Sequence, residues 1–531
     1  MAIKLSPYSH VAHVALWLLI STTACGDTKE DEELGEPLPP GAACDPNAEN
    51  PNCQAGSECK DRSAGSTEPP AFMCLVGKAG SCDPLAAFCD ADLTCAELED
   101  GSFQCHAPLL VRGSVRELAD HSPVAGAHVI GLDGESVAVT DVAVSAADGS
   151  YELVLPAVRA ADGKPLLASY TLRADAQTYQ TFPGGLRTAI PFSTQDAVSR
   201  DGALVIESSV TELNLIQLPD DGVKRHMASG QLSDLAGSQT PETQAKLSGV
   251  LIVAEGSETR TTVTDKRGGF TIFNLRDGAF QLDGYAAGVD VVGKSISVSS
   301  ADMQGVELQA KLGSLAKVSG NVQLVNPGDG KATSVILVVE STFEPTFARG
   351  DAPRGLRAQR TGAPSITGAF SITDVPDGRY VVLAGFENDA LVRDPDTNIS
   401  GTNTLHITVQ GGNVDMAESF KVTGALAIVS PGAMQPEAVN SAPMLQWKDD
   451  SSEDWYEVRV YDAFGAEVWR DLKVPGQSGG GNVSLRYAGP MEVGMYYQFR
   501  VTSWRSPGGK AAAPISASED LRGVFYVAGS R

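Results

Sequence analysis

From Leu110 onward, apolar and polar residues alternate in short runs that are separated by Asp-Gly or Gly-Gly pairs. A period of two is typical of half-buried β-strands, and no long stretch has the 3.6-residue period of an amphipathic helix. The chain has 55 Gly and 30 Pro among its 531 residues, which fits many short strands joined by turns. The pattern predicts an all-β protein with few helices.

Three segments of this region share one order of motifs: a strand with an internal Gly, an apolar run, a turn, and then Gly-x-aromatic-x-aliphatic. The final motifs read "DGSYELVLP", "GGFTIFNLRDGAFQLDGY" and "GAFSITDVPDGRYVVLAGF". The second and third segments superpose at an offset of 100 residues, with Phe270 on Phe370 and Phe280 on Tyr380. This agreement over many positions indicates internal repeats.

Each repeat is expected to form an antiparallel β-sandwich. Alternation places Phe270, Ile272, Phe280 and Leu282 on the sides that face the core. Asp-Gly pairs such as Asp277-Gly278 are expected to reverse the chain between antiparallel strands. The whole chain is therefore expected to be a multi-domain string of antiparallel β-sandwiches, preceded by small disulfide-rich modules that are described below.

The order of the repeat motifs resembles the carboxypeptidase regulatory-like, or transthyretin-like, domain, with copies at 108–220, 224–311 and 313–424. The resemblance implies domains without catalytic residues of their own, which accompany catalytic modules or serve as surface and adhesive building blocks. Two insertions depart from the pattern: "AVRAADGKPLLAS" in the first copy, and the Pro- and Arg-rich "FEPTFARGDAPRGLRAQRTGAPS" in the third.

The last hundred residues contain L-x-W, then Y-x-V-x-V, and then a Tyr-x-Phe-x-Val strand. This order resembles a fibronectin type III domain, which we place at 426–531. The resemblance implies that Trp447 is the core tryptophan and that Tyr456, Val458 and Val460 form an inward-facing strand. It also implies that the hydroxyl of Tyr497 bonds back to the chain.

The N-terminus has the layout of a secretory signal peptide: Lys4, an apolar run from Val11 to Ile20, and small residues after it. Its end, "TTACGD", resembles the bacterial lipoprotein cleavage box. The resemblance implies a signal peptide at 1–24, acylation of Cys25, and an extracytoplasmic, lipid-anchored protein at the outer membrane of a Gram-negative bacterium. The alternative is a secreted protein cut after Ala24 with a free thiol. The acidic, Pro-bearing segment 25–41 is predicted to be a solvated tether.

The other eight cysteines form two sets of four within 42–107, and each set opens with Cys-Asp-Pro. The sets are Cys44, Cys53, Cys59 and Cys74, and Cys82, Cys89, Cys95 and Cys105. Units this small bury little apolar surface, so two disulfide-linked modules are the simplest interpretation, with the connectivity left open. Zinc is the competing interpretation, but neither set contains a C-x2-C pair.

Charge and histidine content restrict the function. With 66 acidic and 40 basic residues, the net charge of −26 opposes binding to nucleic acid. None of the seven histidines begins H-x-x-E or H-E-x-x-H, so the zinc carboxypeptidase motif is absent from the sequence. We expect no catalytic residues, no cofactor and no resident metal.

Residues 288–295 read "GVDVVGKS" and match the phosphate-loop pattern letter for letter. A phosphate loop needs a buried strand that leads into a helix N-terminus. Here the residues after Lys294 alternate as in a strand, and Val289, Val291 and Val292 are β-branched. We therefore predict strand structure and no nucleotide binding.

Two further matches are weak. "GQSGG" at 476–480 fits the nucleophile-elbow pattern around Ser478, but it is expected in a hairpin loop without the strand-to-helix turn. "DPDTNISG", from Asp394 to Gly401, offers alternating oxygen ligands for calcium, but Ile399 replaces the EF-hand Gly and no Glu closes the loop. A solvated acidic turn is favoured there.

These observations favour a non-enzymatic, lipid-anchored surface protein that presents β-sandwiches for protein or glycan binding. The alternative is a carbohydrate-binding accessory lipoprotein that assists a separate enzyme, because the regulatory-like fold is similar to starch-binding domains. Coplanar exposed aromatic rings would support that alternative, and Trp455 and Trp504 are the residues to check. An enzyme would require a site assembled across domains.

Overall fold

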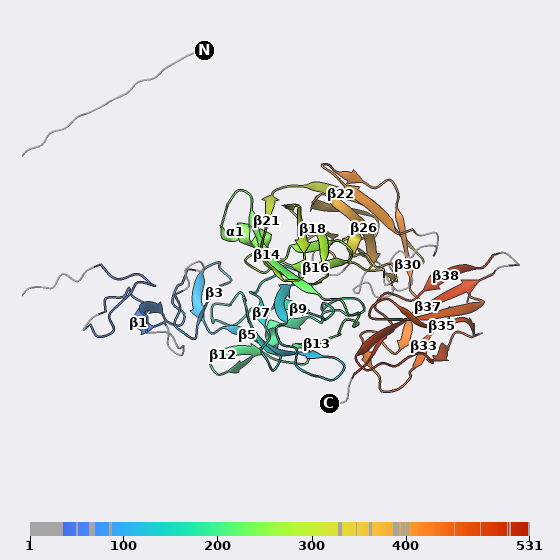
Figure 1. Cartoon of the computed structure of the whole chain (residues 1–531), viewed down its shortest axis with the longest axis horizontal. Helices are drawn as coiled ribbons and strands as arrows, with labels where there is room; N and C mark the ends of the chain where they lie inside the picture. Colours follow the sequence, from blue (N-terminus) through green and yellow to red (C-terminus); the bar gives the residue numbers. More distant parts are fainter. Residues whose placement is uncertain are drawn as a thin grey trace, which may run out of the picture. The chain divides into compact units, whose positions relative to one another are not determined.

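The computed structural model describes residues 36–48, 51–62, 70–83, 88–327, 332–346, 348–359, 364–385, 392–393, 399, 403–450, 452–477, 479–506, 508 and 511–528. About 52% of the structure is strand and 3% is helix, which confirms the predicted all-β, multi-domain class (Figure 1). The chain divides into two compact units, with the boundary after Val76.

The two cysteine modules have the same disulfide framework. Module 1 contains the antiparallel strands β1 (Ser57–Asp61) and β2 (Phe72–Val76), and module 2 contains β3 (Thr94–Glu97) and β4 (Phe103–His106). In each module the first cysteine pairs with the third and the second with the fourth: Cys44–Cys59, Cys53–Cys74, Cys82–Cys95 and Cys89–Cys105. Module 1 belongs to the first unit, and module 2 belongs to the second.

Sandwich 1 follows module 2. Its strands are β5 (Leu109–Glu117), β6 (His128–Asp133), β7 (Ala143–Val144), β8 (Ser150–Leu155), β9 (Ser169–Asp175), β10 (Phe192–Ser193), β11 (Val198–Arg200), β12 (Ala203–Ile206) and β13 (Glu212–Leu215). One sheet has the order β10-β9-β6-β7, and the other has the order β11-β12-β5-β13 with β8 also on β5. A short 3₁₀ turn, η1 (Thr194–Asp196), lies between β10 and β11.

In sandwich 2, hydrogen bonds connect all eight strands into one continuous sheet. Its elements are β14 (His226–Asp234), α1 (Pro241–Leu247), β15 (Leu251–Glu255), β16 (Thr259–Val263), β17 (Gly269–Leu275), β18 (Gly278–Ala286), β19 (Val289–Val292), β20 (Lys294–Val298) and β21 (Met303–Leu312). The order is β16-β15-β18-β19-β21-β14-β17, with β20 also on β18.

Sandwich 3 has two separate sheets. Its elements are β22 (Ala316–Val325), β23 (Ser334–Val339), η2 (Glu340–Thr342), β24 (Arg357–Ala358), β25 (Ala369–Val375), β26 (Gly378–Gly385), β27 (Val392–Arg393), β28 (Leu405–Val409), β29 (Val414–Asp415) and β30 (Phe420–Gly424). The sheet orders are β25-β22-β30-β27, with β29 also on β22, and β24-β23-β26-β28.

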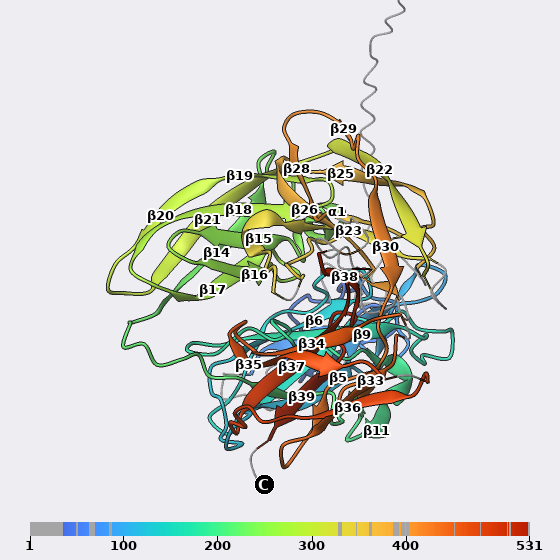
Figure 2. The ribbon, with the colours of Figure 1, turned by 90° about the vertical axis from the view of Figure 1, so that its right-hand side faces the viewer.

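Sandwich 4 follows sandwich 3. Its strands are β31 (Ile428–Ser430), β32 (Glu437–Ala438), β33 (Met444–Lys448), β34 (Trp455–Asp462), β35 (Glu467–Pro475), β36 (Asn482–Arg486), β37 (Met495–Arg505), β38 (Ala513–Ala517) and β39 (Val524–Val527) (Figure 2). The sheet orders are β31-β33-β36 and β32-β39-β37-β34-β35, with β38 also on β37.

The core residues of sandwich 4 include those expected from the sequence. Trp447, Tyr456, Val458 and Val460 are fully buried. The hydroxyl of Tyr497 accepts a hydrogen bond from the backbone of Glu492 at 2.9 Å, five residues earlier in the chain.

The repeated glycine and aromatic residue of sandwiches 1 to 3 face each other across two paired strands. The pairs are Gly113 with Tyr151, Gly230 with Phe270 and Gly320 with Phe370. In all three pairs, a Cβ atom on the glycine would lie 2.8 Å from the Cζ atom of the aromatic ring. Only glycine leaves room for the ring, which explains why the two motifs recur together.

The core positions of sandwich 2 are as predicted, because Phe270, Ile272, Phe280 and Leu282 are all buried. The expectation for the Asp-Gly pairs was wrong. Asp277-Gly278 joins β17 to β18, and these two strands are not neighbours in the sheet. The same pair in sandwich 3 joins β25 to β26, which belong to different sheets. The turns therefore carry the chain across the core.

Each of these three sandwiches also contains parallel pairing. The first strand pairs antiparallel with the Gly-x-aromatic strand and parallel with the last strand: β5 with β13, β14 with β21 and β22 with β30. The repeats thus share a mixed sheet that the alternation pattern did not reveal.

Apolar contacts also join the sandwiches of the second unit. Leu251, Val253 and Tyr285 of sandwich 2 belong to the same buried cluster as the core of sandwich 3. Leu118 and Ile216 of sandwich 1 cluster with Ala463 and partly buried aromatic residues of sandwich 4. Residues that face outward from one sandwich therefore become buried at its neighbour.

Candidate functional site

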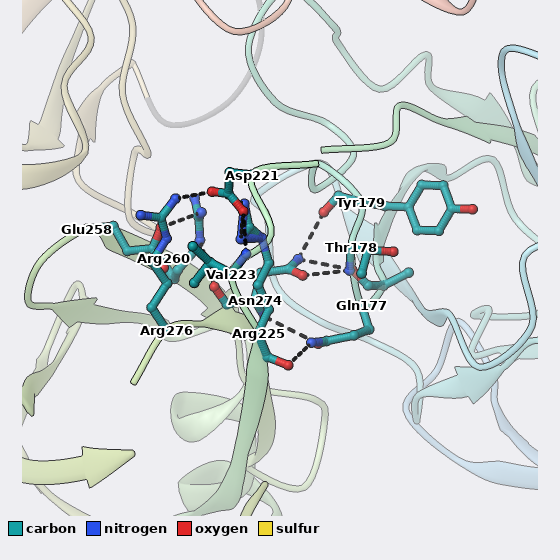
Figure 3. Close-up of polar contacts among 11 residues, drawn as sticks. Gln177, Thr178, Tyr179, Asp221, Val223, Arg225, Glu258, Arg260, Asn274 and Arg276 are labelled. Carbon is teal, nitrogen blue, oxygen red and sulfur yellow. Dashed lines mark hydrogen bonds and ion pairs between the residues drawn. The ribbon is translucent and has the colours of Figure 1, made fainter. Parts of the chain in front are cut away.

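Asn274, at the end of β17, fixes sandwich 2 against the loop that follows β9 in sandwich 1 (Figure 3). Its amide nitrogen donates to the carbonyls of Ala176 and Tyr179, both at 3.0 Å, and its amide oxygen accepts from the backbone N–H of Thr178 at 2.6 Å. Asn274 has φ of 65°, a left-handed conformation that Asn adopts more readily than most residues. The side chain of Asn274 is buried, and its amide groups form these hydrogen bonds with the protein rather than with solvent.

An arginine cluster lies beside this contact (Figure 3). Asp221 accepts from Arg225 at 3.1 Å and from Arg276 at 2.5 Å, and Glu258 accepts from Arg260 at 2.7 Å. Burial lowers the pKa of Arg260, and the nearby Glu258 opposes that change. Three guanidinium groups against two carboxylates give the cluster a positive balance in an acidic protein.

Arg260 also lines a cleft of about 520 Å³ to which all four sandwiches contribute. Its walls include Gln180 and Thr181 after β9, Thr259 and Thr261 on β16, Ser341, Phe343 and Asp351 after β23, and Phe464 between β34 and β35. This volume lies within the ~300–1,000 Å³ range of small-ligand sites, which often form between domains.

The carboxylates of the cleft have defined partners. Asp175 forms a buried ion pair with Arg173 at 2.9 Å and accepts from the hydroxyl of Thr181 at 2.6 Å. Asp351 accepts from the hydroxyl of Thr261 at 2.6 Å. Arg173 also donates to the carbonyl of Thr261 at 3.0 Å, so sandwiches 1, 2 and 3 meet in one polar network.

The insertion in the third repeat builds one wall of the cleft. Arg349 in this insertion donates to the carbonyl of Gly185 in sandwich 1 at 2.7 Å. Arg500 of sandwich 4 donates to the carbonyl of Thr346 in the same insertion, also at 2.7 Å. The insertion therefore links sandwich 3 both to sandwich 1 and to sandwich 4, which follows the repeats.

The insertion in the first repeat has a similar role at module 2. The backbone N–H of Arg159 donates to the carbonyl of Glu97 at 2.8 Å, and the N–H of Glu99 donates to the carbonyl of Arg159 at 2.9 Å. The guanidinium of Arg159 is buried and donates to the carbonyl of Ala107. Both departures from the repeat pattern thus make contacts between domains.

The described residues that were singled out in the sequence as candidate site residues do not line this cleft. Cys25 and Ser478 are outside the described residues, as is most of the segment from Asp394 to Gly401, where only Ile399 is described. Among the described residues, the only groups of His, Cys, Asp and Glu close enough to share a metal ion are cysteines already paired in disulfides.

The structure confirms the predicted strand character of "GVDVVGKS". Val289–Val292 forms β19, and Lys294 begins β20, which pairs with β18. Lys294 is exposed and donates to the carbonyl of Glu307 at 3.0 Å. The segment "GQSGG" is not in a hairpin, because β35 pairs with β34 whereas β36 pairs with β33 of the other sheet.

Trp455 and Trp504 are paired across β34 and β37, with ring planes 6° apart and centroids 6.1 Å apart. Both are half-buried. The ammonium of Lys473, on β35, lies 3.3 Å from the ring centroid of Trp455, on the opposite neighbouring strand from Trp504. The two ring planes are parallel and stacked rather than coplanar, and Lys473 covers Trp455, so the rings do not form an open aromatic platform.

The cleft residues were missed by sequence reasoning because they come from four sandwiches and share no local pattern. The insertions were the one feature of the sequence that could have indicated the cleft, because the third-repeat insertion supplies Phe343 and Asp351 to its wall. No helix among the described residues is long and apolar enough to cross a bilayer.

No protein-family model matches the chain, and no curated protein matches it. Among solved structures, the Bacillus anthracis TIE protein matches with 10% identity and a TM-score of 0.15, over 77% of this chain and 69% of its own. A Streptococcal ancillary pilin matches with 11% identity and a TM-score of 0.17, over 60% and 99%. The major pilin subunit of Bacillus cereus matches with 10% identity and a TM-score of 0.16, over 58% and 99%. At these scores the similarity supports no functional argument.

Proposed function

We propose that this protein is a non-enzymatic, lipid-anchored cell-surface protein whose β-sandwiches bind a protein or glycan. The proposal combines the predicted acylation of Cys25 and the tether at 25–41 with the architecture of the second unit. The anchor would hold the protein at the outer membrane, and the folded domains would present the binding surface away from it.

The main support for a binding role comes from the contacts that the third-repeat insertion makes with two other sandwiches. A protein that served only as a spacer would need no loop that bridges three sandwiches around a cleft. Here Arg349 and Thr346 of the insertion contact sandwiches 1 and 4. Binding residues are commonly placed on loops that a rigid scaffold positions.

The anchor is tested by metabolic labelling with a palmitate analogue, followed by membrane fractionation. Cys25→Ser is expected to abolish the label and to move the protein to the soluble fraction, because thioether-linked and amide-linked acyl chains together resist dissociation. Thr28→Ser is the matched control and should keep both properties. Membrane retention of unlabelled Cys25→Ser would refute the anchor.

The binding role is tested with the full mature chain carrying Cys25→Ser, which is screened on glycan arrays and on arrays of surface proteins. Saturable binding to one class of ligand is expected. An absence of binding on both arrays, for a sample with intact disulfides and a cooperative melting transition, would contradict the binding role.

A further inference from the structure

We infer that the cleft between the four sandwiches binds a short, electrically neutral oligosaccharide. This inference rests on the proposed binding function and specifies both the site and the ligand class. Its first basis is the chemistry of the walls, which carry the hydroxyls of Thr181, Thr259, Thr261 and Ser341 together with amide and carboxylate groups. Such a mixture of donors and acceptors matches a ligand that offers many hydroxyl groups.

Several polar groups of the cleft retain hydrogen-bonding capacity. The hydroxyl of Ser341 is buried and has no partner among the described residues. Buried polar groups without a partner are uncommon, and a bound ligand is one reason for their presence. Arg260 uses Nε for the carbonyl of Asn274 and Nη2 for Glu258, which leaves Nη1 for another acceptor. Asp351 uses Oδ2 for Thr261 and retains Oδ1 as an acceptor.

Aromatic rings supply the apolar part of the wall. Phe343 and Phe464 line the cleft, and both are half-buried. Phe273 is less available because it is buried against the ring of His128. The C–H faces of a pyranose ring are apolar, so a sugar can contact an aromatic ring with one face while its hydroxyls reach the polar walls.

The charges of the cleft disfavour an anionic ligand. The charge of Asp175 is balanced by Arg173. Of the remaining charged wall groups, the carboxylates of Asp351 and Glu344 outnumber the single guanidinium of Arg260, which belongs to the arginine cluster and already pairs with Glu258. This excess of carboxylates, in a chain of net charge −26, disfavours sulfated and uronic-acid glycans. Among oligosaccharides, neutral ones therefore fit the cleft best.

The test uses the full mature chain carrying Cys25→Ser. An array of neutral malto-, cello-, xylo- and chito-oligosaccharides is compared with an array of sialylated glycans and oligogalacturonides. Binding on the neutral array is expected, and the strongest neutral ligand is then titrated by calorimetry. Stronger binding to the acidic glycans would contradict the inferred charge preference.

Two substitutions place the ligand in the cleft. Ser341→Ala removes a hydroxyl that has no partner among the described residues, so the melting temperature should stay unchanged while affinity falls about five- to tenfold, as for one lost hydrogen bond. Phe343→Ala should weaken binding by about tenfold or more through the lost ring contact. Ser199→Ala and Met434→Ala, at exposed positions in sandwiches 1 and 4, are the matched controls and should bind as the parent does.

The outcomes separate this inference from the proposed function. If neutral oligosaccharides bind but Ser341→Ala and Phe343→Ala leave affinity unchanged, the cleft is not the site, although the binding role remains. If only proteins bind, the ligand class is wrong. Hydrogen exchange provides an independent measurement: ligand should slow exchange at 259–261 and 341–346, and unchanged exchange in both segments would overturn the assignment.

Discussion

Sandwiches 2 and 3 share one sequence pattern at an offset of 100 residues but differ in how their sheets close. In sandwich 2, β19 pairs with both β18 and β21, so that all eight strands form one sheet. In sandwich 3, β27 pairs with β30, and the described strands form two sheets. The shared motifs therefore determine the core pairs, whereas the segments between the motifs determine how the sheets close.

The two repeats also differ in how the first strand pairs with its parallel neighbour. In sandwich 2, Gly230 on β14 lies opposite Val306 of the continuous strand β21. In sandwich 3, the parallel partner of β22 is divided into β29 and β30, and Gly320 lies between their two ladders. Equivalent glycines thus have backbone close by in one repeat and mainly side chains in the other.

The largest expected effect is an unequal response to the same substitution at these glycines. A Cβ atom at Gly230 would lie 1.8 Å from the carbonyl oxygen of Val306, which can move only with its strand. At Gly320 the nearest atoms belong to the side chains of Phe370 and Met416, at 2.8 and 3.2 Å. We expect Gly230→Ala to destabilise its sandwich by about 3 kcal/mol or more and Gly320→Ala by about 1–2 kcal/mol.

Hydrogen exchange of β14 and β22 measures these effects locally, which a multi-domain chain requires because a single global unfolding free energy is not defined. Gly305→Ala is not a suitable control, because Gly305 has a φ of 70°. Gly313→Ala is suitable, since Gly313 has no positive φ and open space around its Cβ position. Equal losses of protection at Gly230 and Gly320 would contradict the proposed role of the continuous strand β21.

The second prediction concerns equivalent positions in the two repeats, which are occupied by Asn274 in sandwich 2 and Asp374 in sandwich 3. Each residue is replaced by the one found in the other repeat. Both have a positive φ, of 65° and 62°. Asn274 donates two hydrogen bonds to sandwich 1, whereas the side chain of Asp374 accepts one from Leu315. Asn274→Asp should therefore cost about 2–3 kcal/mol because the carbonyls of Ala176 and Tyr179 lose their donor, while Asp374→Asn should cost less than about 1 kcal/mol.

Hydrogen exchange of β17 in Asn274→Asp and of β25 in Asp374→Asn checks this exchange. The same experiment tests the contact with sandwich 1, because Asn274→Asp should also speed hydrogen exchange at 176–179. A loss of stability in Asp374→Asn as large as that in Asn274→Asp would show that the left-handed conformation, rather than the amide donor, matters at this position.

The sequence predicted well which strand residues face the core, but it predicted the strand pairing and the contacts between domains poorly. Phe270 and Ile272 were placed correctly because strand alternation depends only on neighbouring residues. The contact of Arg349 with Gly185 joins residues 164 positions apart, and neither residue belongs to a periodic pattern. The Asp277-Gly278 turn was misassigned because the same pair suits a hairpin and a connection across the core. The cleft could not be predicted because each sandwich contributes only a few residues to it.

The third prediction concerns a smaller difference between the repeats. Tyr380 is buried and donates to the carbonyl of Pro376 at 2.9 Å, whereas its counterpart in sandwich 2 is Phe280. Tyr380→Phe gives sandwich 3 the side chain of sandwich 2 and should cost about 1 kcal/mol through the lost hydrogen bond. Tyr285→Phe is the matched control, because the Tyr285 hydroxyl makes no hydrogen bond among the described residues. Hydrogen exchange of β26 in Tyr380→Phe and of β18 in Tyr285→Phe measures the difference, and an equal effect would contradict the role of Pro376.

The smallest expected effect is at Lys294, in the segment of sandwich 2 that matches the phosphate-loop pattern. The side chain is exposed and has a single hydrogen bond, to the carbonyl of Glu307, so Lys294→Ala should change stability by no more than about 0.5 kcal/mol. Calorimetric titration of the parent chain with ATP and magnesium should give only heat of dilution. Lys294 pairs with Leu282 where β20 meets β18. Consecutive backbone N–H groups in a paired strand point to opposite sides, so they cannot converge on a phosphate as those of a helix N-terminus do. Saturable micromolar binding that Lys294→Ala abolishes would show that β19 and β20 rearrange around a nucleotide, and the comparison of sandwiches 2 and 3 would then have to include a ligand-dependent strand.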